Sequence, residues 1–204
     1  MQTAHEFFLH ELSDMLDAER KILNALEEQA NESTNPQLQK AFQQHREQTQ
    51  GQVERLETCF EELDEEPEET ECAGIKGLIE EHDNMKDEDP SDDILDIFNA
   101  VAASKVERYE ITAYESLIRL ADMMEHTKVS RLLKQNLREE EQTLKKVQAI
   151  GNKLKPEDMG MEEEEEVEEE TMETETFGGE EGEQSSRKRG ATSTKSKSRK
   201  GRAA

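Results

Sequence analysis

Apolar residues recur three or four positions apart along most of the first 155 residues of the chain. Because this spacing gathers them on one face of a helix, it predicts an all-α fold of four long helices. The helices are expected over residues 3–31, 35–63, 91–124 and 127–154. Thr3 and Ser91 suit helix N-caps. Pro36 suits the first turn of its helix, and Pro156 is a stop signal after the last one. The sequence has no credible strand.

Each predicted helix has one mostly apolar face, and these four faces form the candidate core. The first two faces consist of Phe8, Leu12, Met15, Glu19, Ile22 and Leu26, and of Leu38, Phe42, His45, Thr49, Gln52, Leu56, Cys59 and Leu63. The last two consist of Leu95, Phe98, Ala102, Val106, Glu110, Ala113, Leu117 and Leu120, and of Val129, Leu133, Leu137, Glu140, Leu144, Val147 and Leu154. A body of about 155 residues is large enough for one buried core.

The connections between the helices differ in length, which constrains the topology. The first and the last pair are each joined by a few residues, so each pair is expected to form an antiparallel hairpin. The link over residues 64–90 is far longer and has room for a short helix from Gly74 to Glu81. A link of this size can run along a helix of about 45 Å. The sequence therefore predicts a four-helix bundle with one long crossover, in which the second and third helices run parallel.

Four ionisable residues interrupt the apolar faces, one on each helix: Glu19, His45, Glu110 and Glu140. A buried carboxylate without a partner is costly and usually becomes protonated instead. Four converging helices that each tolerate one such residue indicate a shared partner. A metal ion is the partner that best suits several carboxylates and one imidazole. Glu107 flanks the face of the third helix and joins the candidate ligands.

The same residues also have simpler interpretations. His45 could be a hydrogen-bonded core histidine, and Glu19 could face its basic neighbours at the edge of the bundle. Dinuclear carboxylate bundles combine a Glu from each of two helices with a Glu-x-x-His from each of the other two. Here the second and fourth helices lack that motif, because no His follows an acidic residue at this spacing.

Charge divides the chain into three segments, which are the expected domains. Residues 1–156 hold 36 acidic and 18 basic residues and are expected to form the bundle. Residues 157–183 hold 15 acidic residues and no basic one, whereas residues 184–204 hold eight basic residues and no acidic one. Both tail segments are expected to be disordered. The acidic body should repel nucleic acid and anionic lipid, so only the basic tail could make a weak nucleic-acid contact.

The sequence contains no evident targeting or membrane-spanning segment. Its N-terminus lacks the charged and apolar regions of a signal peptide, and no apolar run approaches the roughly 18 residues of a membrane span. A cytoplasmic location without membrane contact is therefore expected. The two cysteines, Cys59 and Cys72, lack the spacing of a metal site and are expected to be reduced. Cys59 lies on an apolar face and is interpreted as a small buried hydrophobe.

Several stretches of the chain are, as a set, similar to one known family. They are Asp17-Ala18-Glu19, His45 with Thr49 and Gln52, the link from Cys72 to Glu81, Val106 to Ile111 with Tyr114, and Leu137 to Glu141. In this order they resemble the YciE/YciF family of ferritin-like bacterial proteins, which are associated with stress. The resemblance covers roughly residues 3–155. It implies a ferritin-like four-helix bundle, often a homodimer, with a candidate di-iron site.

Carried over position by position, the resemblance implies metal ligands at Glu19, His45, Glu107, Glu110 and Glu140. Iron is the implied metal, and manganese is an alternative. Where relatives usually read Glu-His-Tyr-Glu, this chain has Arg108 after Glu107. A cation beside the site would weaken metal binding, and Arg108 could pair with a carboxylate and replace the metal.

Two functions are consistent with these features. The first is a stress-associated ferritin-like protein with a di-iron carboxylate site. The second is a metal-free structural or interaction bundle whose basic C-terminal tail contacts nucleic acid or another acidic partner. A homodimer is expected for either.

Overall fold

The computed structural model describes residues 2–157, which form five helices and no strand. The helices are α1 (Ala4–Glu32), α2 (Pro36–Leu63), α3 (Ala73–Lys86), α4 (Asp92–Met123) and α5 (Thr127–Gly151). The all-α prediction is thus confirmed for this part of the chain. The last helix ends earlier than expected, because the N–H groups of Lys153 and Leu154 turn back to carbonyls three residues earlier. Apart from Glu157, the predicted tail segments 157–183 and 184–204 lie outside the described residues.

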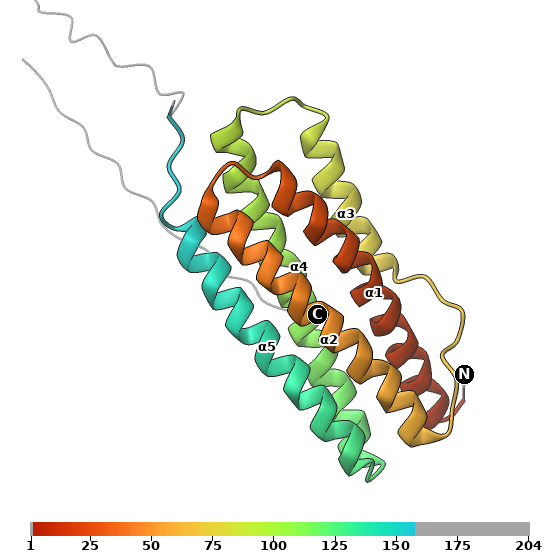
Figure 1. Cartoon of the computed structure of the whole chain (residues 1–204). Coiled ribbons are helices and arrows are strands. Elements are labelled where there is room, and N and C mark those ends of the chain that lie inside the picture. Colours follow the sequence, from red (N-terminus) through yellow and green to blue (C-terminus); the bar gives the residue numbers. More distant parts are fainter. Residues whose placement is uncertain (1, 158–204) are drawn as a thin grey trace, which may run out of the picture. The chain divides into compact units, whose positions relative to one another are not determined.

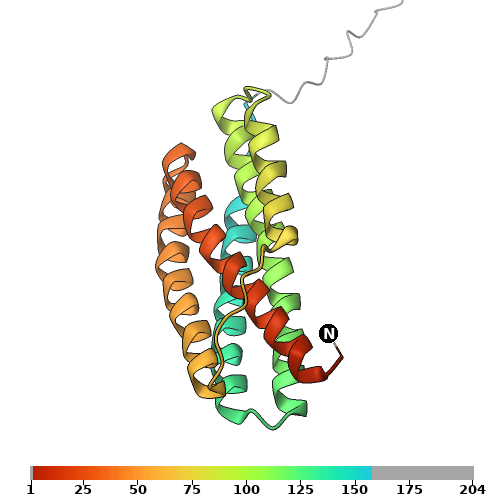
Figure 2. The ribbon, with the colours of Figure 1, turned by 90° about the vertical axis from the view of Figure 1, so that its right-hand side faces the viewer.

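Two antiparallel hairpins, α1 with α2 and α4 with α5, pack together as a four-helix bundle (Figure 1). The chain returns from the end of α2 along the bundle to the start of α4, so α2 and α4 run in the same direction (Figure 1). The short helix α3 lies in this crossover and packs on α4 and α1 (Figure 2). The predicted ferritin-like bundle with one long crossover is therefore confirmed. Within residues 2–157, no helix is both long and apolar enough to span a bilayer.

Local sequence signals set the helix starts. Thr3 and Glu6 form a capping box, in which the Glu6 N–H donates to Thr3 Oγ1 at 3.1 Å and the Thr3 N–H donates to Glu6 Oε2 at 3.3 Å. Asn35 accepts two backbone N–H groups in the first turn of α2. Ser91 precedes α4 as expected, but its hydroxyl donates to Asp93 instead of accepting a backbone N–H.

A buried aspartate holds the turn between α1 and α2 against the start of α4. Asp96 is 5% exposed and accepts from the Thr34 N–H at 3.0 Å, the Thr34 hydroxyl at 2.7 Å and the Asn35 N–H at 2.8 Å. Asn99, one turn further along α4, donates to the Ser33 hydroxyl at 3.1 Å. These contacts connect the two hairpins and so help to set how α1 and α2 face α4.

The core follows the predicted faces of α1 and α2, and Cys59 is fully buried as expected. Cys59 and Cys72 are both free thiols. The buried face of α4 is rotated from the prediction, because α3 covers part of that helix. Phe98 is only half-buried and stacks on His82 of α3 with ring centroids 5.7 Å apart. Val106 is likewise half-buried and lines a cavity beside α3.

The buried face of α5 is also rotated from the prediction, toward polar positions. Leu137 and Leu144 are half-buried, whereas Asn136 is 0% and Thr143 is 5% exposed. Asn136 contacts polar partners on α2 and α4, as described below. The bundle centre is therefore more polar than the apolar pattern predicts.

Two glycines of α3 provide a matched test of how closely the crossover packs on α4. A Cβ at Gly74 would lie 2.5 Å from the ring of Tyr109, whereas a Cβ at Gly77 would meet no atom of residues 2–157 within 4 Å. Gly74→Ala is expected to lower the free energy of unfolding by about 1–3 kcal/mol, because the ring has to move. Gly77→Ala is expected to raise it by about 0.5–1 kcal/mol, because Ala is the better helix former. Urea unfolding measures both changes, and equal effects would contradict the close packing.

Candidate metal centre

Four helices bring the predicted ligands together inside the bundle. Glu19 lies on α1, His45 on α2, Glu107 and Glu110 on α4, and Glu140 on α5. His45 is 2% exposed, and each of the four glutamates is 0% exposed. The alternative that Glu19 faces basic neighbours at the bundle edge is therefore wrong.

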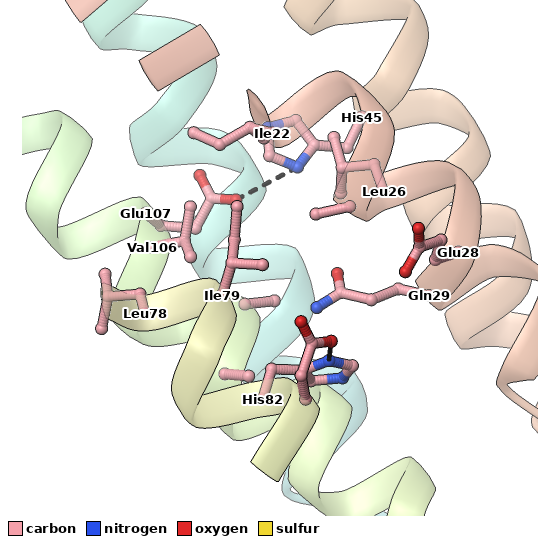
Figure 3. Close-up of a pocket in the computed structure, with 14 residues that line it drawn as sticks. Ile22, Leu26, Glu28, Gln29, His45, Leu78, Ile79, His82, Val106 and Glu107 are labelled. Atoms are coloured by element: carbon pink, nitrogen blue, oxygen red, sulfur yellow. Dashed lines mark ion pairs between the residues drawn. The ribbon is translucent and has the colours of Figure 1, made fainter. Parts of the chain in front are cut away.

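Four of these residues form a compact cluster. One potential ligand atom from each of His45, Glu107, Glu110 and Glu140 lies within 4.8 Å of the others. The imidazole lies between two carboxylates, with Nδ1 3.2 Å from Glu107 Oε1 and Nε2 3.4 Å from Glu140 Oε2. Figure 3 shows the contact between His45 and Glu107. Glu19 stands outside the compact set, but it is close enough to Glu140 for their charges to interact.

The cluster has too few hydrogen-bond donors for its acceptors. Within the described residues, both carboxylate oxygens of Glu107 and of Glu110 lack a hydrogen bond, as do both ring nitrogens of His45. Folded proteins pair the great majority of their buried polar atoms, so this many unpaired atoms at one place call for a missing partner.

Electrostatics leads to the same conclusion. Burial, followed by the negative charge of Glu140, raises the pKa of Glu19, Glu107 and Glu110 well above the ordinary glutamate value. A buried group of carboxyls is stable only if protons or a cation neutralise most of its charge. The site is therefore built either to stay protonated or to hold a cation.

A buried chain of hydrogen bonds orients Glu19. Tyr114 of α4 donates its hydroxyl to Glu19 Oε1 and accepts from Asn136 Nδ2 at 2.9 Å. Arg55 of α2 donates to Asn136 and forms an ion pair with Glu139. Arg55, the basic group at the far end of this series of hydrogen bonds, is thus already paired with Glu139. Only neutral side chains lie between Arg55 and Glu19.

The predicted ligand set omits three polar residues of the site. Gln52 donates its amide to Glu140 Oε1, and Thr49 is fully buried one turn earlier on α2. Thr49 and Gln52 lie four and seven positions after His45 on the same helix, and both are 0% exposed. Thr49 and Gln52 could have been recognised as site residues in the sequence, because both interrupt an apolar face. Asn136 could not, because the helical spacing of α5 favours its neighbour Leu137 as the buried residue.

Arg108 does not enter the metal centre. Its side chain is exposed, and none of the ion pairs within residues 2–157 involves it. The expectation that Arg108 could pair with a site carboxylate and replace the metal is therefore wrong. The reason is helical geometry, since Glu107 and Glu110 are three residues apart and share a face, whereas residue 108 is turned by about 100° from residue 107.

The donor set fits a divalent ion of the first transition series. Carboxylates together with an imidazole suit iron, manganese or zinc. Two ligand atoms on opposite sides of an ion, with bonds of about 2.1 Å, are about 4.2 Å apart. The potential ligand atoms of the cluster lie within 4.8 Å of one another, so they need to move only slightly closer together. The fold and the site together define a ferritin-like helical bundle with a buried His/Glu cluster that could hold a metal.

Comparison with known proteins identifies the family. The sequence profile described as "Domain of unknown function (DUF892)" matches residues 3–175. Protein YciF of Escherichia coli K12 is 36% identical over 144 residues, which cover 70% of this chain and 87% of YciF. The chain therefore belongs to the DUF892 family, the YciE/YciF group of ferritin-like proteins.

Solved structures agree with this assignment. The crystal structure of the E. coli stress protein YciF matches with a TM-score of 0.72 and 34% identity, over 74% of this chain and 96% of that one. YcfI from Rhodopseudomonas palustris, described as a candidate structural protein, matches with a TM-score of 0.71 and 36% identity, over 72% and 94% of the two chains. A protein from Xanthomonas campestris shares the fold at 17% identity, with a TM-score of 0.59 over 73% of this chain and 90% of that one.

Proposed function

We propose that this chain is a stress-associated cytoplasmic protein that binds iron at a di-iron carboxylate site. The observation that carries the proposal is the compact buried cluster of His45, Glu107, Glu110 and Glu140. A cation would supply the partner that its oxygen and nitrogen atoms lack within the described residues. The stress association rests on the similarity to YciF, which is called a stress protein.

The proposal gives each residue of the site a role. His45, Glu107, Glu110 and Glu140 would hold the first ion, and Glu19 would extend the ligand set toward a second. Bound iron supplies redox chemistry with oxygen or peroxide, and manganese is the alternative metal.

Hydrogen bonds already orient two of these carboxylates for metal binding. Tyr114 donates to Oε1 of Glu19 and Gln52 donates to Oε1 of Glu140, and Oε2 of each carboxylate has no hydrogen bond from the described part of the chain. Partners of this kind fix the orientation of metal ligands. Tyr114 and Gln52 are therefore assigned as positioning residues for Glu19 and Glu140.

The metal content of protein purified without chelators tests the proposal. About one or two iron or manganese ions per chain are expected in the wild type. His45→Ala and Glu110→Gln are each expected to lose most of this metal. Glu115→Gln is the matched control, because Glu115 is an exposed residue of the same helix and should leave the metal content unchanged. Arg108→His should also leave it unchanged.

A wild-type content below about 0.2 ions per chain would overturn the proposal. It would favour the second candidate function, a metal-free structural bundle, which agrees with the description of the R. palustris relative. In that case, burial and the charge of Glu140 would keep Glu19, Glu107 and Glu110 protonated, since both raise the pKa of these groups. A contact between the basic tail and nucleic acid belongs to that second proposal, whereas homodimer formation is proposed for either function.

A further inference from the structure

A small cavity connects the predicted metal centre with the side of the bundle that α3 covers. It lies among α1, α3 and α4, with His45 of α2 in its wall (Figure 3). His45 and Glu107 line one end of the cavity, and Gln29 and His82 lie toward the other (Figure 3). The crossover helix therefore does more than connect two hairpins, because it closes a space that reaches the proposed ligands.

The cavity is small and mostly apolar. Its volume is about 30 Å³, whereas one water molecule needs about 10–15 Å³ measured in the same way. Most of its lining is aliphatic, including Ile22, Leu26, Leu78, Ile79, Ala103 and Val106. A space of this size can hold a diatomic molecule but excludes a hydrated metal ion with its shell of water. Aliphatic walls also offer such an ion no ligands in place of that shell.

The two ends of the cavity differ in their free hydrogen-bonding capacity. At the α3 end, His82 Nε2 is already 2.6 Å from Asn99 Oδ1, and it also lies 3.1 Å from Glu32 Oε1, an oxygen that has no hydrogen bond within the described residues. At the inner end, both ring nitrogens of His45 and both oxygens of Glu107 lack hydrogen bonds within the described residues. Among the residues that line the cavity, the unpaired polar atoms thus lie where the cavity meets the metal centre. An occupant would be held by the aliphatic walls and would lie next to the ligands.

The cavity also has a way in from the surface. Leu78, Ile79 and Val106 are half-buried, and Glu28 and Asp83 in its rim are exposed. The side chains that separate the space from solvent therefore belong mainly to α3, which packs on the bundle as a single short helix. Small rotations of aliphatic side chains are enough to admit a diatomic molecule.

We propose that this cavity binds a small apolar molecule of the size of dioxygen, held between α1, α3 and α4 against His45 and Glu107. A role for the occupant as the oxidant of the metal centre rests on the proposed function. Binding of the occupant does not rest on it, because protein side chains alone form the cavity. Metal content and cavity occupancy can therefore fail independently.

Crystals of the full chain, as purified and pressurised with xenon, test the proposal. Xenon resembles dioxygen in being small and apolar, and its anomalous signal locates it directly. A peak is expected among Ile22, Ile79 and Ala103. Ala103→Leu should abolish the peak, because the added carbons fill the space. Val101→Leu is the matched control on α4, since Val101 is 45% exposed and does not line this cavity.

Two further measurements keep the test decisive. Ile79→Ala enlarges the cavity and should raise the xenon occupancy, which covers the case in which Ala103→Leu does not fold. Crystals soaked in Mn²⁺ should show no manganese among the aliphatic side chains of the cavity. Absence of xenon from the wild-type cavity, an unchanged peak in a folded Ala103→Leu variant, or manganese in place of xenon would each overturn the proposal.

Discussion

Iron(II) or manganese(II) is expected to raise the melting temperature of the metal-free wild-type protein by about 5–10 °C. Binding only to the folded state at 100 times the dissociation constant adds about 2.7 kcal/mol of stability. For a domain of about 155 residues, that corresponds to the stated shift. The physical reason is that the ion neutralises a buried cluster in which Glu107 and Glu110 have no hydrogen-bond partner within the described residues. Thermal unfolding followed by circular dichroism, with and without a chelator, measures the shift.

The variants that separate site binding from surface binding are Glu110→Gln and Glu115→Gln. The first removes a buried ligand and should lose most of the shift. The second removes an equal charge from the exposed side of α4 and should keep it. A shift of the same size in both variants would mean that the metal acts on the acidic surface, and it would contradict a buried centre.

Replacing two site glutamates by glutamine is expected to stabilise the metal-free protein at pH 7. The double variant Glu107→Gln/Glu110→Gln should unfold with a free energy about 1–3 kcal/mol higher than that of the wild type, because it removes groups that are costly to ionise in the core. Glutamine has nearly the same shape, and its amide can donate to the remaining carboxylates. The same variant should bind no metal, so stability and metal binding would change in opposite directions, as is common at functional sites.

The stability of the metal-free wild type should also fall as the pH rises. Burial, with the charge of Glu140 second, raises the pKa of Glu107 and Glu110 in the folded state above the ordinary 4.5. The folded state then holds protons that the unfolded state releases. Their contribution to stability is complete below pH 4.5 and is lost as the pH rises toward the folded pKa, by up to about 1.4 kcal/mol per group and pH unit.

Urea unfolding in the presence of a chelator at several pH values measures this effect. The wild type should lose stability as the pH rises above about 4.5, and the double variant should lose clearly less. Glu115→Gln should follow the wild type. Equal slopes for wild type and double variant would show that the site carboxyls do not carry the pH dependence. With metal present, the slope should weaken or reverse, because the metal displaces protons and binds more tightly as the pH rises.

The cost of burying charge is what makes the candidate site visible in the sequence. Glu19, His45, Glu110 and Glu140 interrupt apolar faces, and such an interruption is rarely tolerated without a partner. All four are buried in the structure, and three of them belong to the compact cluster. Glu107, which only flanks its predicted face, is as deeply buried as the others.

The helices themselves were determined locally. The period of apolar residues, the capping box at Thr3 and the cap at Asn35 are interactions within a few residues of the chain, so they can be recognised without knowing the fold. The length of the link between α2 and α4 likewise settled the topology. These features specify the ferritin-like bundle and the helix on which each candidate ligand lies.

Only the tertiary structure decided how each helix is rotated about its own axis. That rotation places Asn136 instead of Leu137 in the centre. It also turns Val106 toward α3, where it helps to form the cavity. The physical reason is that a rotation of a fraction of a turn is set by the packing of all neighbouring helices at once, including the crossover. Helical spacing within one segment shows which broad face is apolar, but it does not fix which residues of that face point to the centre of the bundle.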